Sequence, residues 1–325
     1  MNRKILVSLL ATFLLTTVSL VQAQQQTKVA KIGWLGTRLA AGPASGPAVI
    51  QQELSELGYV EGKNLIFERR YTKGKLDRLP ALANELVRLN VDVILTGSTP
   101  SAKAAKDATR TIPIVFWTEG DPVVAGLVDS LARPGGNITG FTSISPVIAG
   151  KRLELLKEIV PRLSRVAVLW TARQSDQSWE ESQLAGRKLG LQIHSMELSS
   201  TDEFGNAFKE AINAGIAALA VTPNPLTNSN RKLIADLAAQ NRLPVIYPRE
   251  DFVESGGLMS YGANRAEAYK RVASMAARIL KGAKPADLPV EQPTKFELVI
   301  NLKAAKQIGL TIPPNVLARA DKVIK

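Results

Sequence analysis

The sequence has no cysteine and only one histidine among its 325 residues. Without cysteine the chain forms no disulfide, no thiolate metal site and no cysteine nucleophile. A single histidine also argues against histidine-based catalytic triads and multi-histidine metal sites. That histidine, His194, lies in the alternating segment 191–197, so we expect it on a strand, either at the surface or satisfied by neighbouring groups. The composition therefore predicts no metal site and no cofactor.

Aromatic residues are also scarce, at 5% of the chain, whereas 41 lysines and arginines outnumber 29 aspartates and glutamates. The basic residues are scattered among acidic ones, as in KRLELLKEIVPRLSR (151–165), and form no block interleaved with aromatics. This distribution argues against a nucleic-acid partner. The excess of positive charge instead favours acidic small molecules or an acidic partner surface.

Residues 1–23 have the features of a secretory signal peptide. Arg3 and Lys4 precede an apolar stretch, and Val21-Gln22-Ala23 is a small-x-small cleavage signature. The apolar stretch is short for a spanning helix, which makes a retained membrane anchor the weaker alternative. We expect cleavage after Ala23, a periplasmic location and no stable membrane insertion afterwards. Removing Arg3 and Lys4 from the 41 basic residues leaves 39 against 29 acidic ones, a mature net charge of +10.

Short β-branched runs alternate with helical patterns through the rest of the chain. The first series of runs comprises residues 29–35, 64–71, 91–95 and 112–117. After residues 137–141 a second series begins, which comprises residues 165–170, 191–197, 216–221 and 243–247. Such alternation favours parallel sheets covered by helices on both faces. Because the alternation occurs twice, with a seam near 140–145, the predicted fold class is α/β, with two doubly wound parallel-sheet lobes.

In open parallel sheets a ligand binds outside the carboxyl ends of the strands. Small hydroxyl groups, amides and three of the few aromatics follow the predicted strands, which makes these positions candidates for the ligand site. The candidate ligand-binding residues are Thr37, Ser98, Thr99, Ser101, Trp117, Glu119, Asp121, Thr142, Trp170, Thr171, Asn224, Tyr247 and Arg249. Each aromatic among them has an alternative role as a cap on the local core.

The turn GSTPS, residues 97–101, has two interpretations. Thr99 suits an N-cap and Pro100 the first helical position, which makes the turn a plain helix start. Alternatively, free backbone N–H groups together with the hydroxyls of Thr99 and Ser101 receive a ligand carboxylate. Trp117, Trp170 or Tyr247 would then supply an apolar or stacking wall for the rest of the ligand.

Three long segments resemble the ABC-transporter substrate-binding family of the tryptophan/tyrosine type. They begin with NITGFTSISPVIAGKRLELL, NRLPVIYPREDFVESGG and KPADLPVEQPTKFELVINLK, and the resemblance runs from Lys31 to Ile324. It implies a type I periplasmic-binding-protein fold, in which three crossover segments join two lobes that hold ligand between them. The crossovers are expected near 139–145, near 256–261 and in the proline-rich stretch 284–293. The implied division is a signal peptide at 1–23, lobe 1 at 24–141 plus 262–288, and lobe 2 at 142–261 plus 289–325.

The resemblance also implies a function. The chain would be an extracytoplasmic solute-binding protein, a monomer that captures a small organic ligand for an inner-membrane ABC permease. In the family, the turn matched by Thr99, Pro100 and Ser101 faces the ligand, and Asp121-Pro122 matches a shared dipeptide. The alternative is a ligand sensor that presents its closed form to a membrane signalling receptor.

One departure from the family bears on the ligand. Relatives that recognise amino acids often have an acidic residue where this chain has Asn224. An amide does not neutralise an α-ammonium group, so the ligand is expected to be a carboxylate, either an aromatic acid without an amino group or, if Glu119 or Glu250 replaces the missing charge, an amino acid.

Catalysis is the remaining alternative. No GxGxxG follows a strand, and neither GxxxxGK[ST] nor GxSxG occurs in the sequence. Four carboxylates near strand ends would be available for acid–base work, namely Glu119, Asp121, Glu250 and Asp251. Without a metal or an electrophile to act on, they do not make an enzyme the preferred interpretation.

Overall fold

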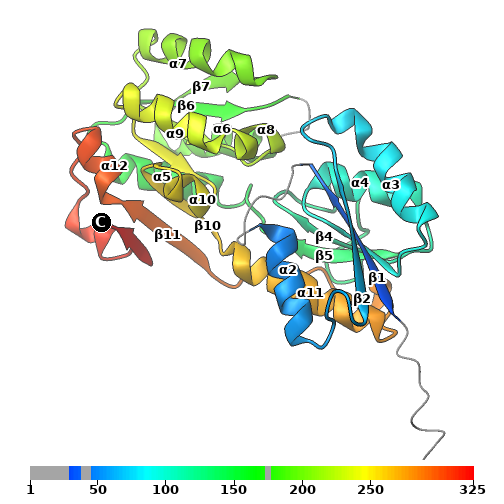
Figure 1. Cartoon of the computed structure of the whole chain (residues 1–325). Helices are drawn as coiled ribbons and strands as arrows, with labels where there is room; N and C mark the ends of the chain where they lie inside the picture. The colour runs from blue at the N-terminus through cyan, green and yellow to red at the C-terminus, as the bar shows by residue number, and fades with distance from the viewer. Residues whose placement is uncertain (1–28, 38–44, 173–176) are drawn as a thin grey trace, which may run out of the picture.

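The computed structural model describes residues 29–37, 45–172 and 177–325, so the predicted signal peptide lies outside the described residues. Two α/β lobes lie next to each other, each with one sheet between layers of helices (Figure 1). This arrangement confirms the predicted fold class. Within the described ranges no helix combines the length and the apolar character needed to cross a membrane.

The first lobe has a five-stranded, all-parallel sheet in the order β2-β1-β3-β4-β5. The strands are β1 (Ala30–Gly36), β2 (Leu65–Tyr71), β3 (Val93–Thr96), β4 (Ile114–Thr118) and β5 (Ile138–Thr142). One face packs against α2 (Gly46–Glu56) and α11 (Arg265–Leu280), and the other against α3 (Leu79–Arg88), preceded by η1 (Leu76–Arg78), and α4 (Thr99–Ala108). Because helices cover both faces, β3, β4 and β5 are buried along their whole length, as the apolar runs of β3 and β4 predict.

The second lobe has a seven-stranded sheet in the order β12-β11-β10-β9-β8-β6-β7, in which only the β10–β11 pair is antiparallel. The strands are β6 (Arg165–Trp170), β7 (Gln192–Glu197), β8 (Ala218–Val221), β9 (Val245–Tyr247), β10 (Met259–Ala263), β11 (Phe296–Asn301) and β12 (Lys322–Ile324). The last three strands were not predicted, because β10 is rich in small and polar residues and β12 has only three residues. His194 is exposed on β7, as predicted.

Helices cover both faces of the second sheet as well. The cluster around α5 and α6 fills one face together with α12 and α13, and the cluster around α7, α9 and α10 fills the other. The bounds are α5 (Ala149–Ile159), α6 (Gln177–Leu189), η2 (Thr201–Glu203), α7 (Phe204–Asn213), α8 (Pro225–Ser229), α9 (Arg231–Gln240), α10 (Glu250–Glu254), η3 (Pro285–Asp287), α12 (Leu302–Gln307) and α13 (Pro314–Leu317).

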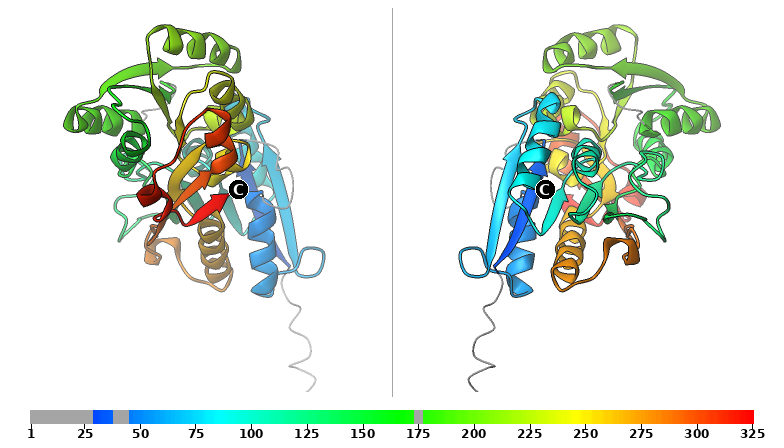
Figure 2. Two further views of the ribbon diagram at one scale, coloured as in Figure 1. Left: turned by 90° about the vertical axis from the view of Figure 1, so that its left-hand side faces the viewer. Right: turned by 90° about the vertical axis from the view of Figure 1, so that its right-hand side faces the viewer.

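The chain passes between the two sheets three times. The first passage follows β5. The second follows β10, which pairs in the second sheet as far as Ala263, two residues beyond the predicted lobe boundary. α11 then lies beside α2 on the first lobe (Figures 1 and 2). The third follows Glu291, whose N–H donates to the Gly140 carbonyl at 2.9 Å, so the first lobe extends three residues past its predicted end at 288.

Candidate ligand-binding cleft

The carboxyl ends of strands from both sheets border a cleft of about 750 Å³. The first lobe contributes residues that follow β1, β3 and β4, and the second lobe contributes residues that follow β6, β8 and β9. Parallel strands place their exits at one edge of a sheet, which explains why segments far apart in sequence meet here. A ligand in this cleft contacts both lobes at once.

Four aromatic side chains of the first lobe line the cleft: Trp34, Tyr71, Trp117 and Tyr269. We call them the aromatic wall. Trp117 and Tyr269 pack edge to face, with ring centroids 5.3 Å apart. The indole Nε1 atoms of Trp34 and Trp117 are buried and have no hydrogen-bond partner among the described residues. The Tyr71 hydroxyl is likewise buried without a recorded partner, so the wall combines ring surface with three unsatisfied polar groups.

Two glycines at strand exits make room for the ring of Trp34. A Cβ atom on Gly36 would lie 2.5 Å from Trp34 Nε1, and one on Gly97 would lie 2.9 Å from Trp34 Cη2. Real Cβ atoms do not approach other atoms this closely. A side chain at either position would displace the indole, so these glycines serve the shape of the aromatic wall.

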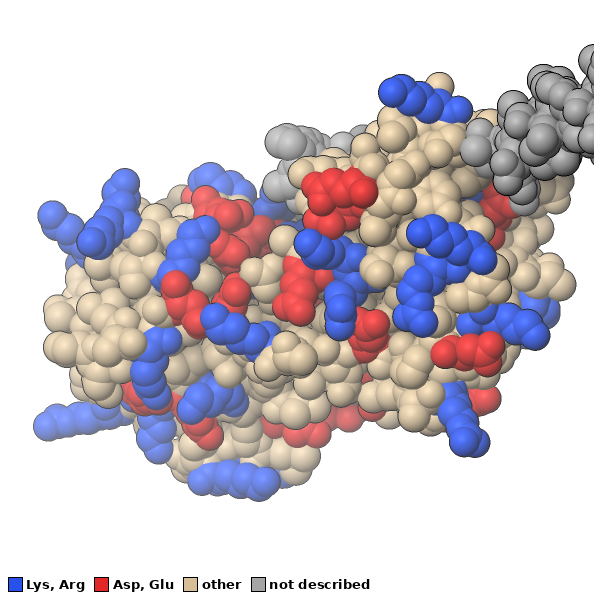
Figure 3. Space-filling view, turned by 90° about the horizontal axis from the view of Figure 1, so that it is seen from below, with Lys and Arg blue, Asp and Glu red and all other residues tan. Residues whose placement is uncertain are grey.

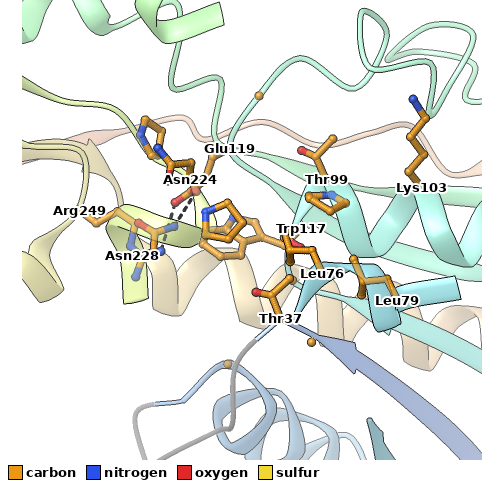
Figure 4. Close-up of a pocket in the computed structure, with 18 of the residues that line it drawn as sticks. Thr37, Leu76, Leu79, Thr99, Lys103, Trp117, Glu119, Asn224, Asn228 and Arg249 are labelled. Carbon is orange, nitrogen blue, oxygen red and sulfur yellow. Dashed lines mark hydrogen bonds and ion pairs between the residues drawn. The ribbon is translucent and has the colours of Figure 1, made fainter. Parts of the chain in front are cut away.

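The two sides of the cleft differ in polarity. Leu76, Leu79, Pro80 and Ala104 extend the aromatic wall with apolar surface on the first lobe. Figure 4 shows Leu76 and Leu79 with Thr37 and Thr99 on one side, whereas Glu119, Asn224, Asn228 and Arg249 gather on the other. The cleft therefore suits a ligand with an apolar body and a polar or charged end.

Glu119, of the first lobe, bridges to the second lobe. One carboxylate oxygen accepts from Asn228 Nδ2 at 3.2 Å, and the other accepts from Arg249 Nη1 at 3.3 Å. A further contact joins the lobes nearby, where the Asp121 N–H donates to Gln177 Oε1 at 2.9 Å. These contacts join the two sides of the cleft.

Arg249 and Asp251 form the centre of a buried ion-pair network. Arg249 Nε donates to Asp251 at 3.0 Å, Arg249 Nη2 makes a second contact with the same carboxylate, and Arg265 Nη1 donates to it at 2.8 Å. Burial opposes the charge on Arg249, but Asp251 and Glu119 outweigh it and raise the pKa of Arg249. Burial likewise opposes the charge on Asp251, yet Arg249 and Arg265 lower the pKa of Asp251 to about 2. Both groups are therefore charged at neutral pH.

A second buried arginine, Arg152, lies behind the network. Its Nε donates to the Tyr261 carbonyl and its Nη2 to Ser145 Oγ, both at 2.8 Å. Burial lowers the pKa of Arg152 to about 10, although the charge of Glu119 works in the opposite direction. Because Ser145 belongs to the first passage between lobes and Tyr261 to β10, which precedes the second, Arg152 ties these two parts of the chain together.

The start of α4 differs by one residue from the prediction. Ser98 is the N-cap, with extended backbone (φ −165°), and its hydroxyl accepts from the Ser101 N–H at 3.4 Å. Thr99 is already helical, so the prediction that Thr99 caps the helix is wrong, and Pro100 is the second helical residue. Ser101 is fully buried, with its hydroxyl 3.0 Å from that of Ser98. Thr99 lines the cleft, but the Ser101 hydroxyl does not.

We expect Ser98→Ala to lower the free energy of unfolding by about 1 kcal/mol, because the cap on α4 is lost. Thr99→Ala removes no cap and should change it by less than about 0.5 kcal/mol. Urea denaturation of both variants without ligand measures the difference. A larger loss for Thr99→Ala than for Ser98→Ala would contradict this assignment of the cap.

Most of the predicted site residues line the cleft: Thr37, Ser98, Thr99, Trp117, Glu119, Asp121, Thr171, Asn224 and Arg249. Three others besides Ser101 do not. Thr142 donates its hydroxyl to the Gly120 carbonyl at 2.7 Å. Trp170 stacks on Trp179 at 5.0 Å and bonds Ser195. Tyr247 is fully buried in the second lobe's core, against Phe252.

The structure also decides between two carboxylates that were expected to replace the acidic group missing at Asn224. Glu119 lines the cleft, whereas Glu250 lies outside it and pairs with Lys322. Asn224 itself caps α8, accepting from the Thr227 N–H at 2.9 Å. Glu119 is thus the carboxylate available at this end of the cleft.

Sequence reasoning missed several lining residues: Trp34, Tyr71, Arg231, Arg265 and Tyr269. Trp34 had a usable signal, because it lies two residues before Gly36 at the exit of β1 and on the same side of the strand. Arg265 and Tyr269 had none, because α11 reaches the first lobe only through the second passage between lobes.

The charges on one face of the molecule are mixed in sign. On the face shown in Figure 3, basic and acidic side chains are interspersed rather than gathered into one basic patch. In the part of the chain that the structure describes, no group of three or more histidine, aspartate or glutamate side chains is arranged to hold a metal ion.

Comparison with known proteins gives consistent matches. A family model described as ABC transporter substrate binding protein matches residues 45–324. A tyrosine-binding protein of Clostridioides difficile (strain R20291) is 28% identical over 259 residues, which cover 79% of this chain and 74% of the relative.

Solved structures agree over almost the whole chain. A conserved domain protein from Vibrio cholerae superimposes with a TM-score of 0.83 at 31% identity, covering 91% of this chain and 100% of that one. An ABC domain from Streptococcus pneumoniae in complex with L-Trp gives a TM-score of 0.82 at 28% identity, with coverage of 91% and 99%.

Proposed function

The chain belongs to the ABC transporter substrate binding protein family, and from this we propose that it captures a small aromatic carboxylate, an aromatic amino acid or aromatic acid, between its lobes. The proposed partner is an inner-membrane ABC permease that receives the ligand. The proposed location of the mature chain is the periplasm, where it acts as a monomer after cleavage of the signal peptide.

The polarity of the cleft carries the proposal. The aromatic wall and the adjoining leucines and prolines offer apolar surface at one side of the cleft, and the ion-pair network, which joins residues of both lobes, offers charge at the other. An aromatic ring with a carboxylate a few bonds away matches both sides at once. The relatives support the choice, since one is named a tyrosine-binding protein and another was solved with L-Trp.

Calorimetric titration of ligand-free, refolded protein tests the proposal. We expect L-tryptophan, L-tyrosine or one of their desamino acids, indole-3-propionate and 3-(4-hydroxyphenyl)propionate, to bind with a Kd of about 1 μM or below. L-Alanine should bind roughly 100-fold more weakly or not at all, because it lacks a ring to pack on the aromatic wall. The ligand should be recovered unchanged after long incubation. Failure of all four aromatic compounds to bind would overturn the proposal.

A further inference from the structure

We propose that Arg231 is the residue that selects ligands carrying a carboxylate, by holding that group with its guanidinium inside the cleft. This inference rests on the proposed function and deepens it. Arg231 was not among the residues that the sequence pointed to; its position and its partners support this role.

Arg231 is the first residue of α9 and lines the cleft from the second lobe. The first turn of a helix disfavours a cation, because the backbone dipole is positive at that end. α9 therefore gains no local stability from an arginine here. With 32% of its side chain exposed, Arg231 faces the cleft rather than the core.

The guanidinium of Arg231 makes few contacts within the described residues. Its Nη1 lies 3.5 Å from the Asn228 carbonyl oxygen, at the limit of a hydrogen bond, and its Nε lies 3.9 Å from Asp251 Oδ2. Arg249 and Arg265 bind that same carboxylate more closely, at 3.0 Å and 2.8 Å. Arg249 and Arg265 thus occupy most of the acceptor sites of Asp251. Most of the five N–H donors of Arg231 remain available for a planar anion.

Few carboxylates at this end of the cleft contact the arginines closely. Arg231, Arg249 and Arg265 all pair with Asp251, and Arg249 also pairs with Glu119. Glu254 lines the cleft as well, but its recorded ion pair is with Lys322, at 4.0 Å. Arg152, buried behind the network, bonds carbonyl and hydroxyl oxygens in its recorded contacts. A ligand carboxylate beside Arg231 would give this guanidinium a close anionic partner, whereas a neutral amide would not.

The position also fits the aromatic wall. Arg265 lies over the Trp117 ring, 5.8 Å from its centroid, and pairs with Asp251, which is the carboxylate nearest to Arg231. The charged end of the cleft therefore begins where the ring surface ends. The alternative carboxylate site at the start of α4 has fewer free donors, because the hydroxyl of Ser101 is buried and its N–H is bonded to Ser98.

Acid–amide pairs test the inference: L-tryptophan with L-tryptophanamide, and indole-3-propionate with its amide. In whichever pair binds, we expect wild type to bind the acid at least about 30-fold more tightly than the amide. Arg231→Gln should weaken binding of the acid about 30- to 100-fold and of the amide less than about 3-fold, so the preference is lost. Arg231→Lys keeps the positive charge but lacks the paired N–H donors of a guanidinium, so it should weaken binding of the acid about 10-fold.

Lys232→Gln is the matched control, because it removes a cation from the same first turn of α9 but outside the lining of the cleft. Its affinity for the acid should stay within about 3-fold of wild type. If Arg231→Gln still prefers the acid to the amide, the inference is overturned and the proposed function stands. If that preference is lost in Thr99→Ala and not in Arg231→Gln, the ligand carboxylate binds at the start of α4. If wild type binds L-tyrosine or 3-(4-hydroxyphenyl)propionate instead, the same acid–amide comparison is made with that compound; if it binds none of the four acids, the inference falls together with the proposed function.

Discussion

Arg249→Met is expected to lower the free energy of unfolding of the ligand-free protein by about 3–5 kcal/mol. Arg249 is 8% exposed and contacts the carboxylates of both Asp251 and Glu119. Methionine fills much of the same volume, so the loss arises chiefly from leaving two partly buried carboxylates without their shared cation. Chemical denaturation monitored by tryptophan fluorescence measures it.

The loss should depend on pH in a defined direction. Arg249 holds the pKa of Asp251 at about 2 in the folded protein, below the value of 3.8 expected when unfolded. A lowered folded pKa gives stability that is fully present above about pH 4 and disappears as the pH falls towards 2. The difference between wild type and Arg249→Met should therefore shrink over that interval.

Two further variants show whether the network is the cause. Adding Asp251→Asn to Arg249→Met removes one unpaired carboxylate and should recover part of the loss. Lys232→Met breaks the exposed pair with Asp236 on α9 and should change stability by less than about 0.5 kcal/mol. Equal losses for Lys232→Met and Arg249→Met would contradict this account of the buried network.

The location of the cleft was predictable because it depends on a rule of topology. Alternating strands and helices indicate parallel sheets, and the exits of parallel strands lie at one edge. Thr37, Glu119 and Asn224 follow strands in three different parts of the sequence, and all three line the cleft. This part of the prediction required only the order of the elements, and no knowledge of side-chain contacts.

The direction of each side chain at that edge was not predictable in the same way. Trp117 and Trp170 both lie at strand ends, but Trp117 shares the face covered by α2 and α11, whereas Trp170 stacks on Trp179 of α6. Tyr247 also ends a strand and is fully buried beside Phe252. Which neighbour receives each ring depends on the packing of distant elements.

The charged end of the cleft illustrates the same limit. Arg249 was predicted from its position after β9, but the network around it joins distant parts of the chain. Glu119 follows β4, Asp251 lies in α10, and Arg265, which also binds Asp251, begins α11. No spacing in the sequence joins Glu119 and Arg265 to Arg249, so the network and the free donors of Arg231 beside it become visible only in three dimensions.

The second large effect is expected from the aromatic wall. Trp117→Leu should weaken binding of L-tryptophan, or of its desamino acid if that is the ligand, about 30- to 100-fold. Leucine keeps apolar bulk in the core around Tyr269 but removes the ring face and the buried indole N–H that lie at the cleft. Loss of a packed ring and its edge-to-face partner is worth about 2–3 kcal/mol, which corresponds to that range.

Trp170→Leu is the matched control for this effect, because it makes the same change at another strand end. The Trp170 ring lies outside the cleft, with its Nε1 donating to Ser195 Oγ at 2.8 Å, so affinity should stay within about 3-fold of wild type. Calorimetric titration gives both affinities, and thermal unfolding verifies that each variant is folded under the conditions used. If Trp170→Leu weakens binding as much as Trp117→Leu, or if Trp117→Leu binds as tightly as wild type, the ligand does not pack on the aromatic wall. The matched pair thus distinguishes a ring that contacts ligand from one that only stabilises its own lobe.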